Sequence, residues 1–135
     1  MIGRLKGTVV DILDNVVLLD VKGIGYEIEV TNSALTGLYV SDTELIIFTH
    51  FVVREDAHSL FGFANREERN LFRDLIKVNG IGPKLGLTIL SSIGPERFIN
   101  YIAERDVVAI TSIPGVGKKT AERLVLDLKD KLVSR

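Results

Sequence analysis

Apolar residues in the first half of the chain follow the pattern of short β-strands. In the segment GYEIEV, Tyr26, Ile28 and Val30 fall on one side of an extended chain and two glutamates fall on the other. Five runs rich in Val, Ile, Leu and Phe lie near residues 2–12, 16–21, 24–30, 45–53 and 58–63. Five short strands within about 60 residues predict a small closed barrel, because an open sheet of that size would leave two edges unpaired. The OB-fold is the commonest barrel of this description.

From Asn65 onward the spacing of apolar residues becomes helical. The clearest apolar stripe lies near the C-terminus and comprises Ala121, Leu124, Val125, Leu128 and Leu132. Charged residues occupy the opposite positions, so we expect a helix with one buried and one solvated face. The sequence therefore predicts an α+β, multidomain chain, with a five-stranded OB-fold barrel over residues 1–63 and an all-α domain over residues 64–135.

A short motif occurs twice in the helical half. VNGIGPK covers residues 78–84 and IPGVGKK covers residues 113–119, an offset of 35 residues (113 − 78). In each copy two glycines flank one apolar residue, Ile81 or Val116, which we expect to be buried and to anchor the loop. The second glycine begins a helix, where backbone N–H groups lack intrahelical partners and the helix dipole is positive. Each motif therefore predicts an anion site, and each is followed by lysine.

Two other glycine-rich motifs do not fit these residues. A dinucleotide fingerprint needs a third glycine where Leu85 and Thr120 stand, and a P-loop needs glycine at the position of Ser112. A glycine that ends a helix is the simplest alternative for a single copy. Because both copies share the same helical context and the following lysine, we interpret them as paired helix-hairpin-helix motifs, which bind the DNA backbone without regard to sequence.

The charge of the chain is divided unevenly between its halves. Residues 1–63 hold four Lys+Arg and nine Asp+Glu, a net charge of −5, and the other 13 Lys+Arg and nine Asp+Glu give +4, which sum to the overall −1. The basic half is a candidate polyanion surface, whereas an acidic barrel argues against binding of single strands through it. The chain has no cysteine and two histidines, which excludes disulfides, thiolate metal sites and cysteine nucleophiles. We expect no cofactor, no metal, no membrane segment and a cytoplasmic location.

The barrel followed by VNGIGPK and IPGVGKKTAERL resembles the RuvA family, and the similarity runs from MIGRLKG through THFVVREDAHSLFGF to the last helix. The resemblance implies binding of four-way (Holliday) DNA junctions, held open and square for branch migration by the RuvB motor ATPase in recombination, DNA repair and the SOS response. It also implies a homotetramer, single or paired on the junction, and the RuvC resolvase as a further partner of the full-length protein. RuvA-like proteins have a third, RuvB-contacting domain, which we expect this chain to lack, so the resemblance leaves RuvB recruitment by this chain open.

The resemblance also carries functional residues over to this sequence. The expected DNA contacts are Asn79, Gly80, Gly82, Lys84, Gly115, Gly117, Lys118, Lys119 and Thr120, with Arg123 one helical turn further on. It implies an acidic pin, Glu55 and Asp56, at the turn between two predicted strands, which composition alone would interpret as a solvated turn. Arg54 beside the pin either contacts the DNA backbone at the junction centre or neutralises the turn.

Two further functions stay open at the level of sequence. Helix-hairpin-helix motifs also occur in generic duplex-binding modules and as accessory domains of nucleases and glycosylases. A nuclease needs clustered carboxylates for its metal ions, and Glu55-Asp56 has no companions in the sequence. A glycosylase needs a pocket for a flipped base, and the chain has no Trp and little length to wall one. We therefore expect a DNA-binding subunit without catalytic residues.

Overall fold

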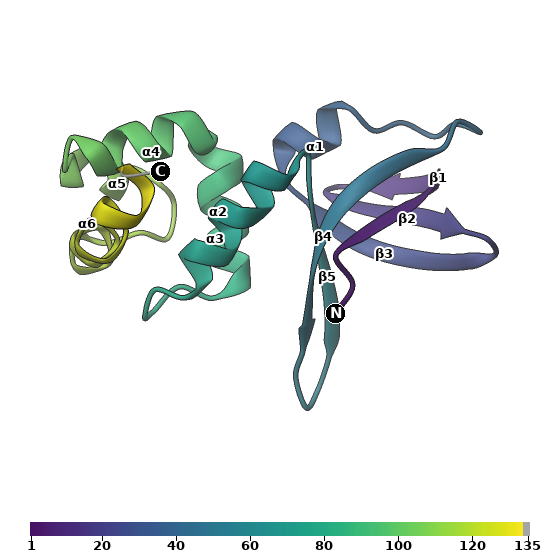
Figure 1. Cartoon of the computed structure of the whole chain (residues 1–135), viewed down its shortest axis with the longest axis horizontal. Helices are drawn as coiled ribbons and strands as arrows, with labels where there is room; N and C mark the ends of the chain where they lie inside the picture. Colours follow the sequence, from purple (N-terminus) through teal and green to yellow (C-terminus); the bar gives the residue numbers. More distant parts are fainter. Residues whose placement is uncertain (134–135) are drawn as a thin grey trace. The chain divides into compact units, whose positions relative to one another are not determined.

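The computed structural model describes residues 1–133 and divides into two compact units, Met1–Arg69 and Asn70–Arg135. Each unit is considered by itself, and Figure 1 shows the elements of both. The division falls within helix α2 (Arg66–Ile76), six residues (69 − 63) beyond the boundary between residues 63 and 64 that charge and periodicity indicate. The first unit is a β-barrel and the second is helical, which confirms the predicted fold class.

The barrel consists of five strands and one short helix. The strands are β1 (Arg4–Leu13), β2 (Val16–Val21), β3 (Ile24–Val30), β4 (Leu45–Val53) and β5 (His58–Phe63), and helix α1 (Asn32–Thr36) follows β3. They close in the order β1-β2-β3-β5-β4. All neighbours are antiparallel except β3 and β5, which pair in parallel. Closure leaves no free sheet edge, which is the reason that such short strands form a stable unit.

Inward-facing aliphatic side chains fill the barrel. Those with at most 2% of their surface exposed are Val9, Val17, Leu19, Ile28, Val30 and Ile47. Two glycines allow strands to approach more closely than any side chain permits. A Cβ on Gly7 would lie 2.2 Å from the carbonyl oxygen of Asp20, and one on Gly62 would lie 2.7 Å from Cγ2 of Ile28. The close packing of the barrel therefore depends on the two glycines as well as on the aliphatic side chains.

A buried carboxylate joins α1, the end of β5 and the start of α2. Glu68, which is 2% exposed, accepts hydrogen bonds from Thr31 Oγ1 at 2.5 Å, from Ser33 Oγ and from the Ala64 amide at 3.1 Å. The Glu68 amide in turn donates to Asn65 Oδ1 at 2.9 Å, in the manner of a helix capping box. Because one carboxylate accepts from all three segments, and its bond from Thr31 is fully buried, Glu68 holds three elements together.

Replacing Glu68 with glutamine is expected to lower the free energy of unfolding by about 1–2 kcal/mol, because an amide has one acceptor oxygen for three donors where the carboxylate has two. Urea unfolding followed by circular dichroism measures this difference. Glu67→Gln is the matched control, since its exposed side chain neighbours Glu68 and the substitution should leave stability unchanged. Equal stability of the two variants would show that the buried hydrogen bonds contribute nothing.

The second unit is built from short helices around one apolar core. Beyond α2 they are α3 (Pro83–Ile93), α4 (Pro95–Ala103), α5 (Val107–Thr111) and α6 (Lys118–Val133). The predicted stripe on α6 is confirmed, because Ala121, Leu124, Leu128 and Leu132 are buried and Val125 is half-buried. An ion pair also joins α6 to α2, because Lys131 Nζ lies 3.1 Å from Oδ1 of Asp74. Within residues 1–133, no helix has both the length and the apolar character that crossing a bilayer requires.

Candidate nucleic-acid interface

The two glycine motifs form matching hairpins in the helical unit. In the first hairpin the Ile81 amide donates to Val78 O at 3.0 Å, and in the second the Val116 amide donates to Ile113 O at 3.1 Å. Each hairpin then opens a helix, where the first intrahelical bonds run from Gly86 N to Gly82 O and from Ala121 N to Gly117 O, both at 2.9 Å. The sequence repeat is therefore a repeat of backbone hydrogen bonds.

The apolar residue between the glycines anchors each hairpin, as predicted. Ile81 is 4% exposed and Val116 is 5% exposed. Residues at equivalent positions in the flanking helices are also buried, with Leu75 matching Ile110. Each loop is therefore held by buried side chains, with Val78 or Ile113 buried besides the anchor, while its glycines and lysines face solvent.

The two glycines of each hairpin have different roles. The first, Gly80 or Gly115, has φ of +92° or +86°, in the region that favours glycine. The second glycine does not need positive φ, since Gly82 has φ −89° and ψ 174°. A Cβ on Gly82 or Gly117 would meet no protein atom within 4 Å. The absence of a side chain there leaves open the approach of an external group to the helix amides.

The hairpins lie next to each other. A Cβ placed on Gly115 would be 3.1 Å from Leu85 Cδ1, so the first turn of α3 packs against the second hairpin. This contact was not predicted, because nothing local in either motif points to it. It brings the two candidate anion sites into one surface of the helical unit.

The hairpins differ in their backbone donors. The first helical position of α3 is Pro83, which has no N–H and whose fixed φ suits that position. The corresponding position of α6 is Lys118, which supplies both an N–H and a cationic side chain. The second hairpin therefore offers an anion one more amide and one more positive charge than the first.

The predicted contacts are accessible. Asn79, Gly80, Gly82, Lys84, Gly115, Gly117, Lys118 and Lys119 are exposed, and Thr120 is half-buried. Arg123 Nε lies 3.7 Å from Asp127 Oδ2 across one helical turn. Because both side chains are substantially exposed, this pair contributes little and leaves the guanidinium able to reach another anion.

The predicted acidic pin lies in the barrel unit, at the end of the β4–β5 hairpin. A hydrogen bond of 2.8 Å from the Arg54 amide to Ala57 O closes the turn, and Glu55 and Asp56 are exposed at its tip. Figure 1 shows this hairpin extending beyond the other strands of the barrel. Both carboxylates are therefore accessible to a group outside the protein. Their role as a pin stays a prediction.

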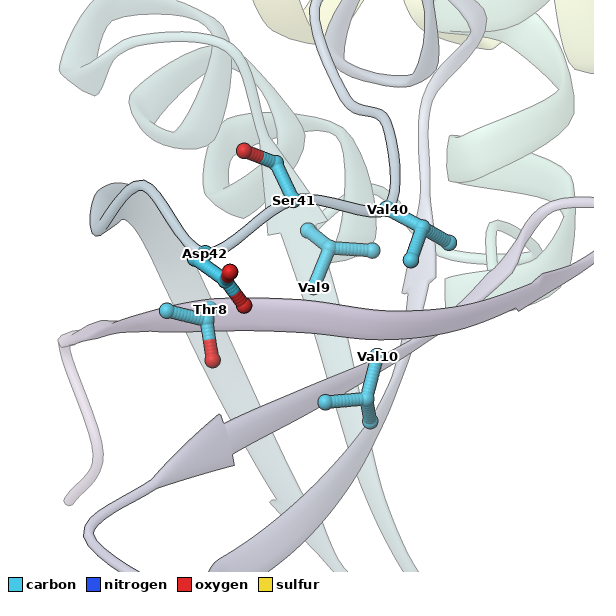
Figure 2. A pocket seen from close by; sticks show the side chains of 6 residues that line it. All are labelled: Thr8, Val9, Val10, Val40, Ser41 and Asp42. Atoms are coloured by element: carbon cyan, nitrogen blue, oxygen red, sulfur yellow. The ribbon is translucent and has the colours of Figure 1, made fainter.

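The barrel unit also has a shallow pocket of about 380 Å³ between β1 and the segment that precedes β4. Figure 2 shows its lining side chains, Thr8, Val9, Val10, Val40, Ser41 and Asp42. None of the predicted contacts lines it, and it holds one carboxylate and no cation. Among residues 1–133, no three His, Cys, Asp or Glu side chains gather in a way that would hold a metal ion.

Comparisons with known proteins agree with the two units. Residues 1–62 match the family described as RuvA N terminal domain, and residues 72–130 match the SAM-like helix-hairpin-helix tandem. Proteins named Holliday junction branch migration complex subunit RuvA share 50% identity with the chain in Cronobacter sakazakii and 48% in Escherichia coli, over 131 residues. Both units of the chain are therefore similar to proteins of the RuvA family. The similarity covers 97% of this chain and 64% of each relative, so the chain spans just under two thirds of the RuvA proteins it matches.

Sequence reasoning missed one side-chain cluster of the RuvA N-terminal unit. Phe48 of β4 lies beneath two arginines of α2, with the guanidinium carbons of Arg66 and Arg69 each 5.5 Å from the ring centroid. Arg66 and Arg69 are three residues apart, a spacing that places both on one helix face. That spacing indicates a pair of cations on one helix face. Their aromatic partner is 18 residues from Arg66 (66 − 48), and no local pattern identifies it.

Proposed function

We propose that the chain binds four-way (Holliday) DNA junctions through their backbone, without sequence preference and without catalysis of its own. The observation that carries the proposal is the pair of matching hairpins, each with a buried anchor and an exposed glycine at a helix start. Such starts bind phosphate, and each amide–phosphate hydrogen bond contributes about 1.5–3 kcal/mol. The relatives' name supplies the junction as the DNA form and branch migration as the process.

The proposal includes the assembly that the family resemblance implies. Four copies would surround the junction as a homotetramer, single or paired, and hold it open and square for the RuvB motor. RuvB, and RuvC in the full-length protein, would be the protein partners, in the cytoplasm, during recombination and repair. ATP hydrolysis would belong to the motor, because GVGKKT lacks the residues of a P-loop.

The acidic pin would supply preference for the junction over continuous duplex. Like charges about 4 Å apart repel by about 1 kcal/mol in water and about 4 kcal/mol at an effective dielectric constant of 20. Four copies of Glu55 and Asp56 around a crossover would therefore guide phosphates outward along the arms. The hairpins would provide affinity and the pin would disfavour a duplex that runs straight through the centre.

A competitive gel shift tests the proposed function. The chain is titrated into a labelled four-way junction with excess duplex of the same arm sequence, at a stated salt concentration. Retention of the junction against duplex supports the proposal. Equal competition by duplex would favour a generic helix-hairpin-helix duplex binder. Strand cleavage of the junction in Mg²⁺ would instead favour a nuclease module.

The double variant Glu55→Gln with Asp56→Asn is expected to bind duplex about fivefold more tightly and to prefer the junction less, since it removes repulsion of roughly 1 kcal/mol without changing shape. Fluorescence anisotropy with both DNA forms measures the two affinities. Asp42→Asn with Glu44→Gln is the matched control, because it removes two exposed charges elsewhere on the barrel. If duplex binding changed equally in both double variants, overall charge and not the pin would be responsible.

A further inference from the structure

A basic surface lies on the barrel unit, apart from the pin. Arg4 and Lys6 occupy alternate positions on β1, so their side chains leave the same face of the sheet. The β1–β4 register pairs Arg4 with Phe48 and Lys6 with Ile46, and paired residues share a face. Arg4, Lys6 and Ile46 are exposed, and Phe48 is half-buried.

Two arginines from the start of α2 reach the same aromatic ring. The guanidinium carbons of Arg66 and Arg69 both lie 5.5 Å from the centroid of Phe48. Arg69 Nη1 also donates to Gly3 O at 2.7 Å, which fixes this arginine beside the beginning of β1. Arg4 is thus paired with Phe48 across the sheet, the two α2 arginines lie over its ring, and Lys6 follows Arg4 on the same face of β1. We name Arg4, Lys6, Arg66 and Arg69 the barrel cation cluster.

The cluster stands out against the negative charge of the barrel half. Residues 1–10 and 45–53, which include the strand segments beside the cluster, contain no Asp or Glu. Asp20, opposite Thr8, is the acidic residue that the register brings onto this face, one pair beyond Lys6. Across residues 1–133, no carboxylate forms an ion pair with Arg4, Lys6 or Arg66. These charges are therefore available to an external anion.

We propose that the barrel cation cluster binds the phosphate backbone of double-stranded DNA, as a contact additional to the hairpins; this rests on the proposed function. Arginine and lysine provide several N–H donors and positive charge, which suit phosphate oxygens. The Phe48 ring is half-buried and two guanidinium groups lie over it, so this surface presents cations to DNA and not an exposed aromatic ring. The cluster therefore recognises charge along a duplex and reads no base.

The double variant Arg4→Gln with Lys6→Gln tests this contact, since these two exposed side chains do not support the packing of α2. Its affinity for junction and for duplex is expected to fall roughly tenfold at moderate salt, and the slope of log K against log salt should become shallower by about 1.8. Lys22→Gln, which removes an exposed cation from the β2–β3 turn of the same barrel, is the control and should leave the slope unchanged. Melting curves of both variants establish that the barrel is folded.

The outcomes separate this proposal from the proposed function. An unchanged slope in the double variant, together with weakened binding by Lys119→Ala, overturns the cluster and leaves the hairpins as the DNA site. Failure of the unaltered chain to bind DNA overturns the proposed function itself. If sedimentation shows that the double variant forms oligomers of a different mass from the unaltered chain, the cluster lies between protein copies, and this also overturns the proposal. If Arg4→Gln unfolds the barrel, Lys6→Gln alone carries the test, with an expected slope change of about 0.9.

Discussion

Replacing Gly82 and Gly117 together with serine is expected to weaken DNA binding roughly a hundredfold without loss of stability. A Cβ at either position meets no protein atom within 4 Å, so the fold accommodates serine. Serine is favoured at the residue before a helix, where its hydroxyl accepts a hydrogen bond from an amide of the first turn. That hydroxyl would occupy the amides that bind phosphate and would stand in the path of the DNA. Stability and affinity should therefore change independently, or in opposite directions.

Anisotropy with a labelled junction at fixed salt measures the affinity of this double variant, and thermal unfolding measures its stability. Gly37→Ser is a suitable control, since Gly37 is an exposed glycine of the barrel unit with φ −92°. Unchanged affinity would show that the helix amides do not hold phosphate. A large loss of stability would contradict the assignment of the two glycines to helix-start positions.

Gly7→Ala is expected to lower the free energy of unfolding of the barrel by roughly 3 kcal/mol. The new Cβ would lie 2.2 Å from the carbonyl oxygen of Asp20 and 2.9 Å from its carbonyl carbon. Both atoms belong to the backbone of β2, so no side-chain rotation relieves the overlap and the two strands must separate. Urea unfolding measured by circular dichroism reports the change.

Gly37→Ala provides the comparison, because its Cβ would make only an ordinary contact of 3.7 Å with Ala34 O. Its stability should stay within about 0.5 kcal/mol of the unaltered chain. If Gly7→Ala were equally stable, the close approach of β1 and β2 would not be a requirement of the barrel.

The features that could be predicted from the sequence are those encoded locally. Runs rich in Val, Ile, Leu and Phe identified β2, β3, β4 and β5 with their observed bounds, and they placed β1 within two residues. The buried anchors Ile81 and Val116 were recognised because two glycines and an apolar residue specify a hairpin within a few positions. Helix α1 was not predicted, since its five residues are too few to show a helical period.

The features that could not be predicted depend on residues far apart in the chain. Glu68 receives hydrogen bonds from Thr31 and Ser33, which precede it by more than 30 residues. The barrel cation cluster exists because strand register brings Arg4 beside Phe48. In both cases the residue types suggest solvated positions, and only closure of the barrel brings them together. The DNA contacts and the pin combine a local motif with a family resemblance, and their roles await the experiments above.

The contact between Leu85 and Gly115 has a mechanical consequence for the proposed function. It packs the first turn of α3 against the second hairpin, so in the proposed function the two hairpins would bind the DNA backbone as one rigid unit and not as two independent contacts. Phosphates repeat regularly along a duplex, so after each base-pair step the same amides and lysines meet equivalent groups. No position along the DNA is then a deep energy minimum. Such binding would keep the protein on the DNA, while the energy barrier between successive base-pair positions would stay low for a motor that moves the arms.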